Sequence, residues 1–419
     1  MSSTSTRAQT QSSAANAAAV HSDRGVQRAL QWLTENVDWV TAQQIRINET
    51  PAPPFGEAIR GGLMRRLLDG HGLRLRTDEA GNIIGERPGA DPRNVVILSA
   101  HLDTVFSKST NVAVRRELAN NGRNGERLIG AGLSDNAVGL AALLAIARAM
   151  NDARLRTGLT MVFAANVGEE GEGNLRGMRK LMETYKGRVR AVIAIDGAAI
   201  DHITAKALAS KRIEVTVTGP GGHSWSDFGQ PNPIHALARG VARFVRVRVP
   251  AEPRTTFNVG TVEGGTSVNS IPYSASVKVD MRSAAGGEID KLEAALREAV
   301  QAGVDEENAA ARERTSRNGQ LKVQFKVLGV RPGGELPENA PLLEAVRAAD
   351  RYLNNRSRIE RSSTDANVPL SMGVPAVSLG AGGRGGGSHS LEEWYEPAGR
   401  EAGLKRILLT VLGVAGVRK

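Results

Sequence analysis

Three short, mostly apolar segments constrain the fold of this chain most strongly. They are residues 94–100 (NVVILSA), 159–166 (LTMVFAAN) and 190–195 (RAVIAI). Apolar runs of this length are typical of strands that are buried on both faces. Helical patterns at 139–150 and 177–185 separate them. The sequence therefore predicts an α/β domain with a mixed central sheet and helices on both of its faces.

A different pattern occupies the middle of the chain. Residues 212–218 alternate between polar and apolar side chains, as in a half-exposed strand. The following segments predict a helix, two strands, a second helix and a last strand, and this β-α-β-β-α-β order is a split-βαβ arrangement. Because buried α/β character then returns, we expect residues 209–330 to form a small domain. It would be inserted into a large domain made of 25–208 and 331–419.

The N-terminal residues 1–24 are predicted to form a disordered tail. The first twenty are rich in Ser, Thr, Ala and Gln and lack the continuous apolar core of a secretory signal. No apolar run approaches the roughly 18 residues of a membrane span. We therefore expect a cytoplasmic protein that has no membrane partner.

The absence of cysteine excludes disulfides, thiolate metal sites and cysteine nucleophiles. A metal would have to be held by His, Asp and Glu. The formal net charge of +10 raises the alternative of nucleic-acid binding. The basic residues are scattered, aromatic residues make up only 4% of the chain, and no nucleic-acid motif is present. The sequence therefore predicts no nucleic-acid partner.

A first polar pair, His101 and Asp103, ends the first apolar strand. Ligands of open α/β sheets bind at that edge. A histidine can give one ring nitrogen to a metal while a carboxylate two residues later holds the other. Taken alone, the pair equally fits two satisfied polar residues in a loop.

Two acidic clusters follow. Asp135 precedes the helix at 139–150, so it is either a helix N-cap or a metal ligand. Glu169 and Glu170 lie among glycines directly after the second strand. Adjacent carboxylates repel each other unless cations or protons compensate them, which favours a metal over a solvated acidic turn.

Asp196 after the third strand and His389 after the glycine-rich loop 380–387 complete the set. Each is unremarkable by itself. Two histidines and three carboxylates at one sheet edge suit two divalent ions about 3.5–4 Å apart, with one carboxylate bridging. We predict zinc, with cobalt or manganese as alternatives. The predicted metal ligands are His101, Asp135, Glu170, Asp196 and His389.

The sequence resembles metallopeptidase family 20 over nearly the whole chain after the tail. The motifs that carry the resemblance are HLDTV, GAGLSDN, GEEGEG, IDG, GGHSWSDFG, SVNSIP, VDMRS and SHSLEEW. Asp78, Gly81-Asn82 and 364–367 are most similar to peptidase T-like members. The resemblance implies a zinc-peptidase-like catalytic domain. It further implies hydrolysis of small peptides or N-acyl amino acids, and exopeptidase action in particular.

The resemblance also implies a role for each polar residue. His101 and Asp196 would hold one ion, Glu170 and His389 the other, and Asp135 would bridge both. The peptide bond after Asp135 would be cis. Asp103 would orient His101, and Glu169 would be the general base.

The inserted domain resembles the family's lid and dimerisation domain. It implies a homodimer in which His223 stabilises the oxyanion, often from the partner subunit. Asn269 and Arg282 would contact substrate, although Arg282 equally fits an outward-facing strand residue. Two other interpretations remain open, namely a zinc aminopeptidase relative that lacks the lid and a non-catalytic metal-binding scaffold.

Overall fold

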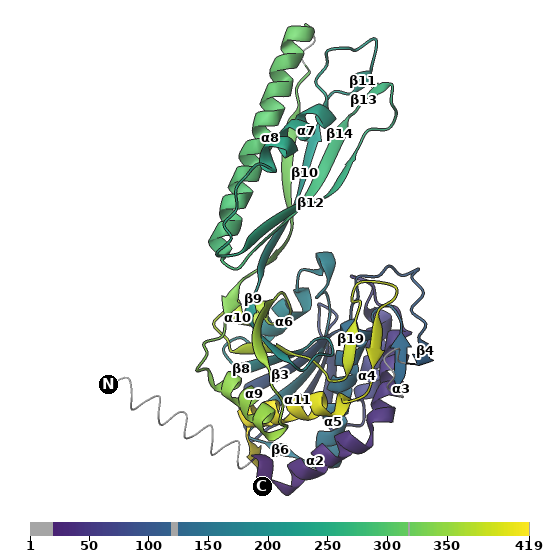
Figure 1. Ribbon diagram of the computed structural model, residues 1–419, viewed down its shortest axis with the longest axis vertical. Helices are drawn as coiled ribbons and strands as arrows, with labels where there is room; N and C mark the ends of the chain where they lie inside the picture. The colour runs from purple at the N-terminus through teal and green to yellow at the C-terminus, as the bar shows by residue number, and fades with distance from the viewer. Residues whose placement is uncertain (1–19, 119–124, 317–318, 419) are drawn as a thin grey trace, which may run out of the picture. The chain divides into compact units, whose positions relative to one another are not determined.

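The computed structural model describes residues 20–118, 125–316 and 319–418 (Figure 1). The chain forms two compact units. The large unit runs up to Ala207 and resumes at Gly334, and the small unit is Leu208–Gly333. Most of the predicted tail, residues 1–19, lies outside the described residues. Its last part is ordered, because Val20 is buried in the core and Asp23 caps the first described helix.

A nine-stranded mixed sheet forms the centre of the large unit, as predicted. Its spatial order is β1 (Arg74–Thr77), β2 (Ile83–Arg87), β7 (Leu159–Asn166), β3 (Asp91–His101), β8 (Val189–Ile195), β18 (Ala376–Leu379), β9 (His202–Ala207) and β16 (Gly334–Glu335), and β17 (Arg358–Ser362) pairs with β9. The four inner strands β7, β3, β8 and β18 are parallel to one another. Their carboxyl ends therefore share one edge of the sheet.

Helices pack against this sheet and supply most of the remaining core. They are α2 (Arg24–Glu35), α3 (Val37–Asn48), α4 (Ala58–Leu68), α5 (Val138–Asp152), α6 (Arg176–Thr184), α9 (Pro341–Tyr352), α10 (Asn367–Ser371) and α11 (Arg400–Ala415). Both α5 and α11 contact β3, β7 and β8 (Figure 1). The apolar spacing at 26–40 suggests a single helix, but the chain forms two, with a break at Asn36.

The helix α5 and the turn before it form a stretch, Leu133–Asp152, that is long and apolar enough to cross a membrane. An 18-residue window of this stretch has a mean hydropathy of 1.3, a run that the sequence prediction underestimated. In the structure 89% of that window is buried inside the protein. It therefore packs as a core helix, which is why it lacks a polar face.

The large unit also contains short strands that were not predicted from the sequence. A small antiparallel sheet has the order β19 (Arg384–Gly386), β20 (Trp394–Glu396), β5 (Glu126–Ile129) and β4 (Arg115–Leu118), and β6 (Arg156–Thr157) pairs with β21 (Val417–Arg418). Strands of two to four residues are too short for a recognisable alternation of polar and apolar side chains.

The small unit contains six longer elements in the order strand, helix, strand, strand, helix, strand, and two short strands that the sequence did not predict lie between them. Its elements are β10 (Ala209–Thr218), β11 (Gly222–His223), α7 (Pro233–Phe244), β12 (Thr255–Gly264), β13 (Ser270–Ile271), β14 (Ser274–Ser283), α8 (Gly286–Arg314) and β15 (Lys322–Arg331). The main sheet is antiparallel, in the order β12-β14-β10-β15. Ile213, Val215 and Val217 are buried in a core of its own with residues of α7 and α8. The sequence pattern predicts the second helix over 288–302, and α8 extends well beyond residue 302.

Candidate metal centre

Four parallel strands deliver four of the five predicted ligands to one edge of the sheet, and Asp135 comes from the turn before α5. Strand β3 ends at His101, and Glu170 follows β7 after a short glycine-containing turn. Asp196 comes directly after β8, and His389 follows the loop that leaves β18. Because neighbouring parallel strands end side by side, residues far apart in the sequence become neighbours here.

The side chains form two groups that share Asp135. His101 Nε2 lies 3.1 Å from Asp135 Oδ1 and 3.8 Å from Asp196 Oδ1. His389 Nε2 lies 3.2 Å from Asp135 Oδ2 and 2.9 Å from Glu170 Oε1. Within each group the candidate ligand atoms all lie within 4.8 Å of one another. Asp135 thus presents one oxygen to each group.

Two atoms at the centre lack the partners that burial would normally require. His101 Nε2 and Asp135 Oδ1 are buried and make no hydrogen bond. Leaving such atoms unsatisfied costs about 1–3 kcal/mol each. Imidazole nitrogens and carboxylate oxygens are the ligands that zinc and similar divalent ions take from proteins without thiolates. The residues present therefore fit a metal ion in each group.

The electrostatics of the groups also favour cations. Burial lowers the pKa of His101, but the carboxylates of Asp135 and Asp196 outweigh it and hold this pKa well above its usual value. Hydrogen bonds with Asp135 and Glu170 raise the pKa of His389 to about 10. Both imidazoles thus lie in a strongly negative environment, created by three clustered carboxylates.

His101 is held in the tautomer that a metal ligand needs. Its Nδ1 donates to the backbone carbonyl of Asp103 at 3.0 Å, which leaves Nε2 facing the other ligands. The Asp103 carboxylate itself is 3.8 Å from Nδ1. The orienting role that the resemblance gives to Asp103 is thus performed here by its main chain.

The Asp103 carboxylate instead holds the second acidic cluster. It is fully buried and accepts the backbone N–H groups of Glu169 at 3.0 Å and Glu170 at 2.7 Å. Asp103 therefore connects the turn that carries His101 to the turn that carries the predicted base. Glu169 is 5% exposed and lies at this same edge of the sheet.

In the turn before α5, one residue hydrogen-bonds to the start of the helix and its neighbour faces the candidate ligands. The peptide bond between Asp135 and Asn136 is cis, as the resemblance implies. Asn136 Oδ1 accepts the backbone N–H of Gly139, and its amide donates to the carbonyl of Ile195. Asn136 therefore caps the helix start, and the Asp135 carboxylate is left to face the two histidines. Gly132 has φ +82° here, and a Cβ would come within 2.7 Å of the Thr104 side chain.

The three predicted residues of the small unit lie in two places. His223 ends β11 of the two-stranded sheet β11–β13, and Asn269 directly precedes β13, so that the backbone N–H of Ser224 donates to Asn269 O. The backbone N–H of Trp225 donates to His223 Nδ1, which leaves Nε2 as the donor of a neutral ring.

Arg282 lies eight residues along β14 from its start, about 26 Å at ~3.3 Å per residue. Its Nε donates to Asp280 at 2.7 Å. Within one small unit, Arg282 and His223 thus do not share a site.

A buried arginine that was not predicted from the sequence supports the His101 turn. Arg60 is completely buried on α4 and donates to the carbonyls of Asn48, Thr50 and Leu102. Leu102 lies between His101 and Asp103, so the hydrogen bond from Arg60 to its carbonyl stabilises this turn. An arginine within an ordinary helical pattern gives no sequence signal for such a role.

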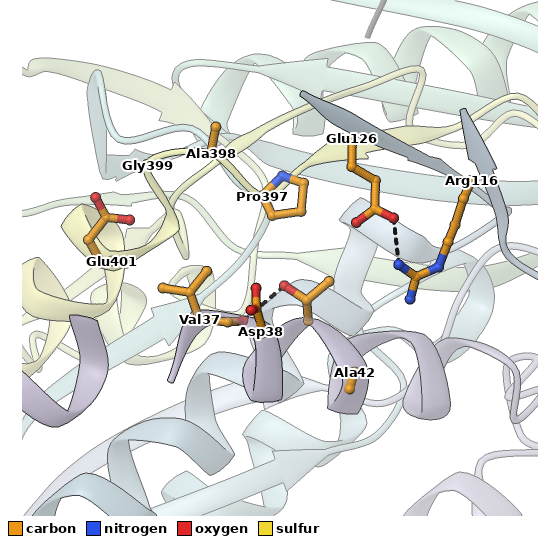
Figure 2. Close-up of a pocket in the computed structure, with 10 residues that line it drawn as sticks. Val37, Asp38, Ala42, Arg116, Glu126, Pro397, Ala398, Gly399 and Glu401 are labelled. Atoms are coloured by element: carbon orange, nitrogen blue, oxygen red, sulfur yellow. Dashed lines mark hydrogen bonds and ion pairs between the residues drawn. The ribbon is translucent and has the colours of Figure 1, made fainter. Parts of the chain in front are cut away.

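A separate pocket of about 410 Å³ lies beside α3, the β4–β5 pair and the start of α11 (Figure 2). Its lining includes Asp38, Glu126 and Arg116, and Figure 2 shows Arg116 paired with Glu126. None of the predicted site residues lines it. It is therefore distinct from the candidate metal centre.

Comparison with known proteins identifies the family of this chain. The family model described as Peptidase family M20/M25/M40 matches residues 97–412, which contain every predicted ligand. The chain belongs to this family. It is a metallopeptidase, and this membership supports hydrolysis of peptide bonds.

Individual relatives of this M20 chain are distant. The uncharacterised protein YqjE of Bacillus subtilis (strain 168) is 24% identical over 325 residues, covering 75% of this chain and 78% of YqjE. The aminopeptidase PepT of Bacillus cereus ATCC 10987 has a TM-score of 0.69 at 18% identity, covering 91% of this chain and 99% of PepT.

A third similar protein is described as binding two metal ions. The YXEP protein of Bacillus subtilis, a dinuclear metal binding peptidase from the M20 family, has a TM-score of 0.62 at 15% identity. The alignment covers 91% of this chain and 99% of that one. At these identities the solved structures establish the shared fold.

Proposed function

We propose that this M20 chain is a two-metal exopeptidase that acts on small peptides or N-acyl amino acids. The observation that carries the proposal is the position of Asp135, whose two oxygens face two different histidines. His101, Asp135 and Asp196 would hold one ion, and Asp135, Glu170 and His389 the other. The two buried atoms that make no hydrogen bond, His101 Nε2 and Asp135 Oδ1, both lie in the first group and support an ion there.

The residues of the chain would divide the remaining chemistry. When bound, two divalent ions such as zinc lower the pKa of water and polarise a carbonyl oxygen. Glu169, which is no member of either ligand group, takes the proton of the attacking water and passes it to the leaving amine. Asp103 keeps Glu169 in place through the backbone. Because His223 and Arg282 do not share a site within one small unit, His223 and Asn269 would act from one chain of a dimer and Arg282 from the other. His223 would donate from Nε2 to the oxyanion, and Asn269 and Arg282 would bind the substrate.

A metal-replacement assay tests this proposal. The protein is stripped with a chelator, reloaded with zinc, cobalt or manganese, and assayed by mass spectrometry. The substrate panel comprises dipeptides, tripeptides, N-acyl amino acids and succinylated amines. We expect two ions per chain and activity that depends on them. Tripeptides blocked at one terminus or the other identify the end that is cleaved.

Hydrolysis that persists undiminished in the metal-free protein would contradict the metal mechanism. Metal binding without cleavage of any panel member would instead support the scaffold interpretation. The family match and the inserted unit already favour this proposal over an aminopeptidase that lacks the lid.

We also propose that two chains pair through the small unit. Strand β12 is an edge strand, and a groove of about 550 Å³ lies beside it, lined mainly by apolar residues of β12, β14 and α7. Val262 is 76% exposed at this edge. Light scattering of Val262→Asp is expected to show monomers. Val327→Asp, on the opposite edge strand β15, is the matched control and should stay dimeric.

A further inference from the structure

Glu393 is a completely buried carboxylate that the proposed mechanism does not use. It directly precedes β20. Its Oε1 accepts the backbone N–H of Ser134 at 2.5 Å and of Asp135 at 2.7 Å, and its Oε2 accepts that of Gly132 at 3.0 Å. All three donors belong to one turn, and this turn carries the proposed bridging ligand.

The main chain of Glu393 is equally engaged. Its carbonyl accepts the N–H of Gly130, and its own N–H donates to the carbonyl of Ser390. The first bond holds the start of the Asp135 turn, and the second closes the short loop after His389. One residue thus connects the backbone segments that carry Asp135 and His389, which belong to the same ligand group.

A purely structural role does not account for this arrangement well. Burying a carboxylate is costly, and a buried ionic group can often be replaced by an apolar one without loss of stability. In the described part of the chain, the recorded hydrogen-bond donors to this carboxylate are all backbone amides. Three hydrogen bonds from Gly132, Ser134 and Asp135 of one turn define the position of this turn more strictly than packing would.

We infer that Glu393 is a positioning residue that fixes the Asp135 turn so that each Asp135 oxygen faces its own metal ion. This inference rests on the proposed two-metal function. Groups that orient metal ligands typically change metal affinity or activity 10–100-fold when they are removed. The effect should therefore be visible in metal binding itself as well as in turnover.

The test is Glu393→Gln in the full chain. The variant keeps the size of the side chain but turns one acceptor oxygen into an NH₂ group, which then faces a backbone N–H. Zinc titration of the metal-free protein by calorimetry should show at least one of the two sites weakened roughly 10-fold or more. The kcat should fall by a similar factor, with KM nearly unchanged.

Glu396→Gln is the matched control. Glu396 is a buried glutamate at the end of the same strand. Its side chain pairs with Arg127 and lies 3.9 Å from Arg384, and among the described residues it accepts no printed bond from the Asp135 turn. We expect its zinc titration and kcat to match those of the wild type. Glu393→Asp keeps the charge at a shorter reach, so it should lie between Glu393→Gln and the wild type.

The outcomes separate this inference from the proposed function. If Glu393→Gln binds two ions with wild-type affinity and turns over normally, Glu393 has no positioning role. If Glu393→Gln does not fold, the zinc titration and the kcat of Glu393→Asp are measured instead. Wild-type values of both in Glu393→Asp would overturn the inference. If the wild type itself fails to bind two ions, the proposed function fails, and the positioning role fails with it.

Discussion

At the scale of single residues, Asp103 shows how one position can serve two turns. Its carbonyl holds the ring of His101, and its carboxylate holds the amides of Glu169 and Glu170. The sequence predicted that Asp103 belongs to the site. It predicted that the Asp103 side chain contacts His101, whereas the main chain makes that contact. Spacing along the chain does not reveal which turn will pack against a carboxylate.

Glu169→Gln is the decisive change at this scale. The glutamine keeps the size of the side chain but cannot accept a proton, so kcat should fall about 10²–10⁴-fold. Metal content, measured by plasma mass spectrometry, should remain that of the wild type because Glu169 is no ligand. Glu172→Gln, in the same turn but exposed, is the control and should leave both quantities unchanged.

At the scale of elements, the site depends on which strands lie side by side. The order β7-β3-β8-β18 brings together the ends of strands that are distant in the sequence. Helix α11 supports the loop that leads from β18 to His389. Gly403 lies so close to this loop that a Cβ would come within 2.2 Å of the backbone nitrogen of Gly382.

Two glycine substitutions in helices should therefore act in opposite directions. Gly403→Ala should lower the free energy of unfolding by about 1–3 kcal/mol through overpacking. Gly62→Ala lies in α4, where the nearest atom to a new Cβ outside the helix backbone is the flexible end of Arg66 at 3.7 Å. It should raise that free energy by about 0.5–1 kcal/mol. Urea unfolding measures both, and equal shifts would contradict the packing around Gly403.

At the scale of the whole molecule, the two units have separate hydrophobic cores. The terminal strands of the small unit are paired, with Ser210 opposite Arg331. An excised fragment 208–333 is thus expected to fold alone and to unfold cooperatively, as followed by circular dichroism. Met281→Asp, which buries a charge in its core, should abolish that transition.

Metal should stabilise one unit and leave the other unchanged. All five proposed ligands lie in the large unit, so zinc added to the metal-free chain should raise the unfolding temperature of that unit only. At 100 times the Kd the expected gain is about 2.7 kcal/mol. Calorimetry of the full chain and of fragment 208–333 makes the comparison, and an equal rise in the isolated fragment would contradict this placement of the ligands.

Local patterns in the sequence are enough to predict the α/β class and the strand ends that carry His101, Glu170 and Asp196. These patterns are apolar runs and the polar residues that terminate them. The sequence also singled out SHSLEEW without assigning Glu393 a role. The break at Asn36 and the small sheet of β19, β20, β5 and β4 were not predicted.

Only the tertiary structure decided how the parts of the site support one another. Whether Asp135 or Asn136 caps α5, which group holds His101, and what Glu393 binds all depend on segments that meet across long sequence separations. A buried hydrogen bond depends on the position of both partners in space, and sequence patterns describe only one partner at a time.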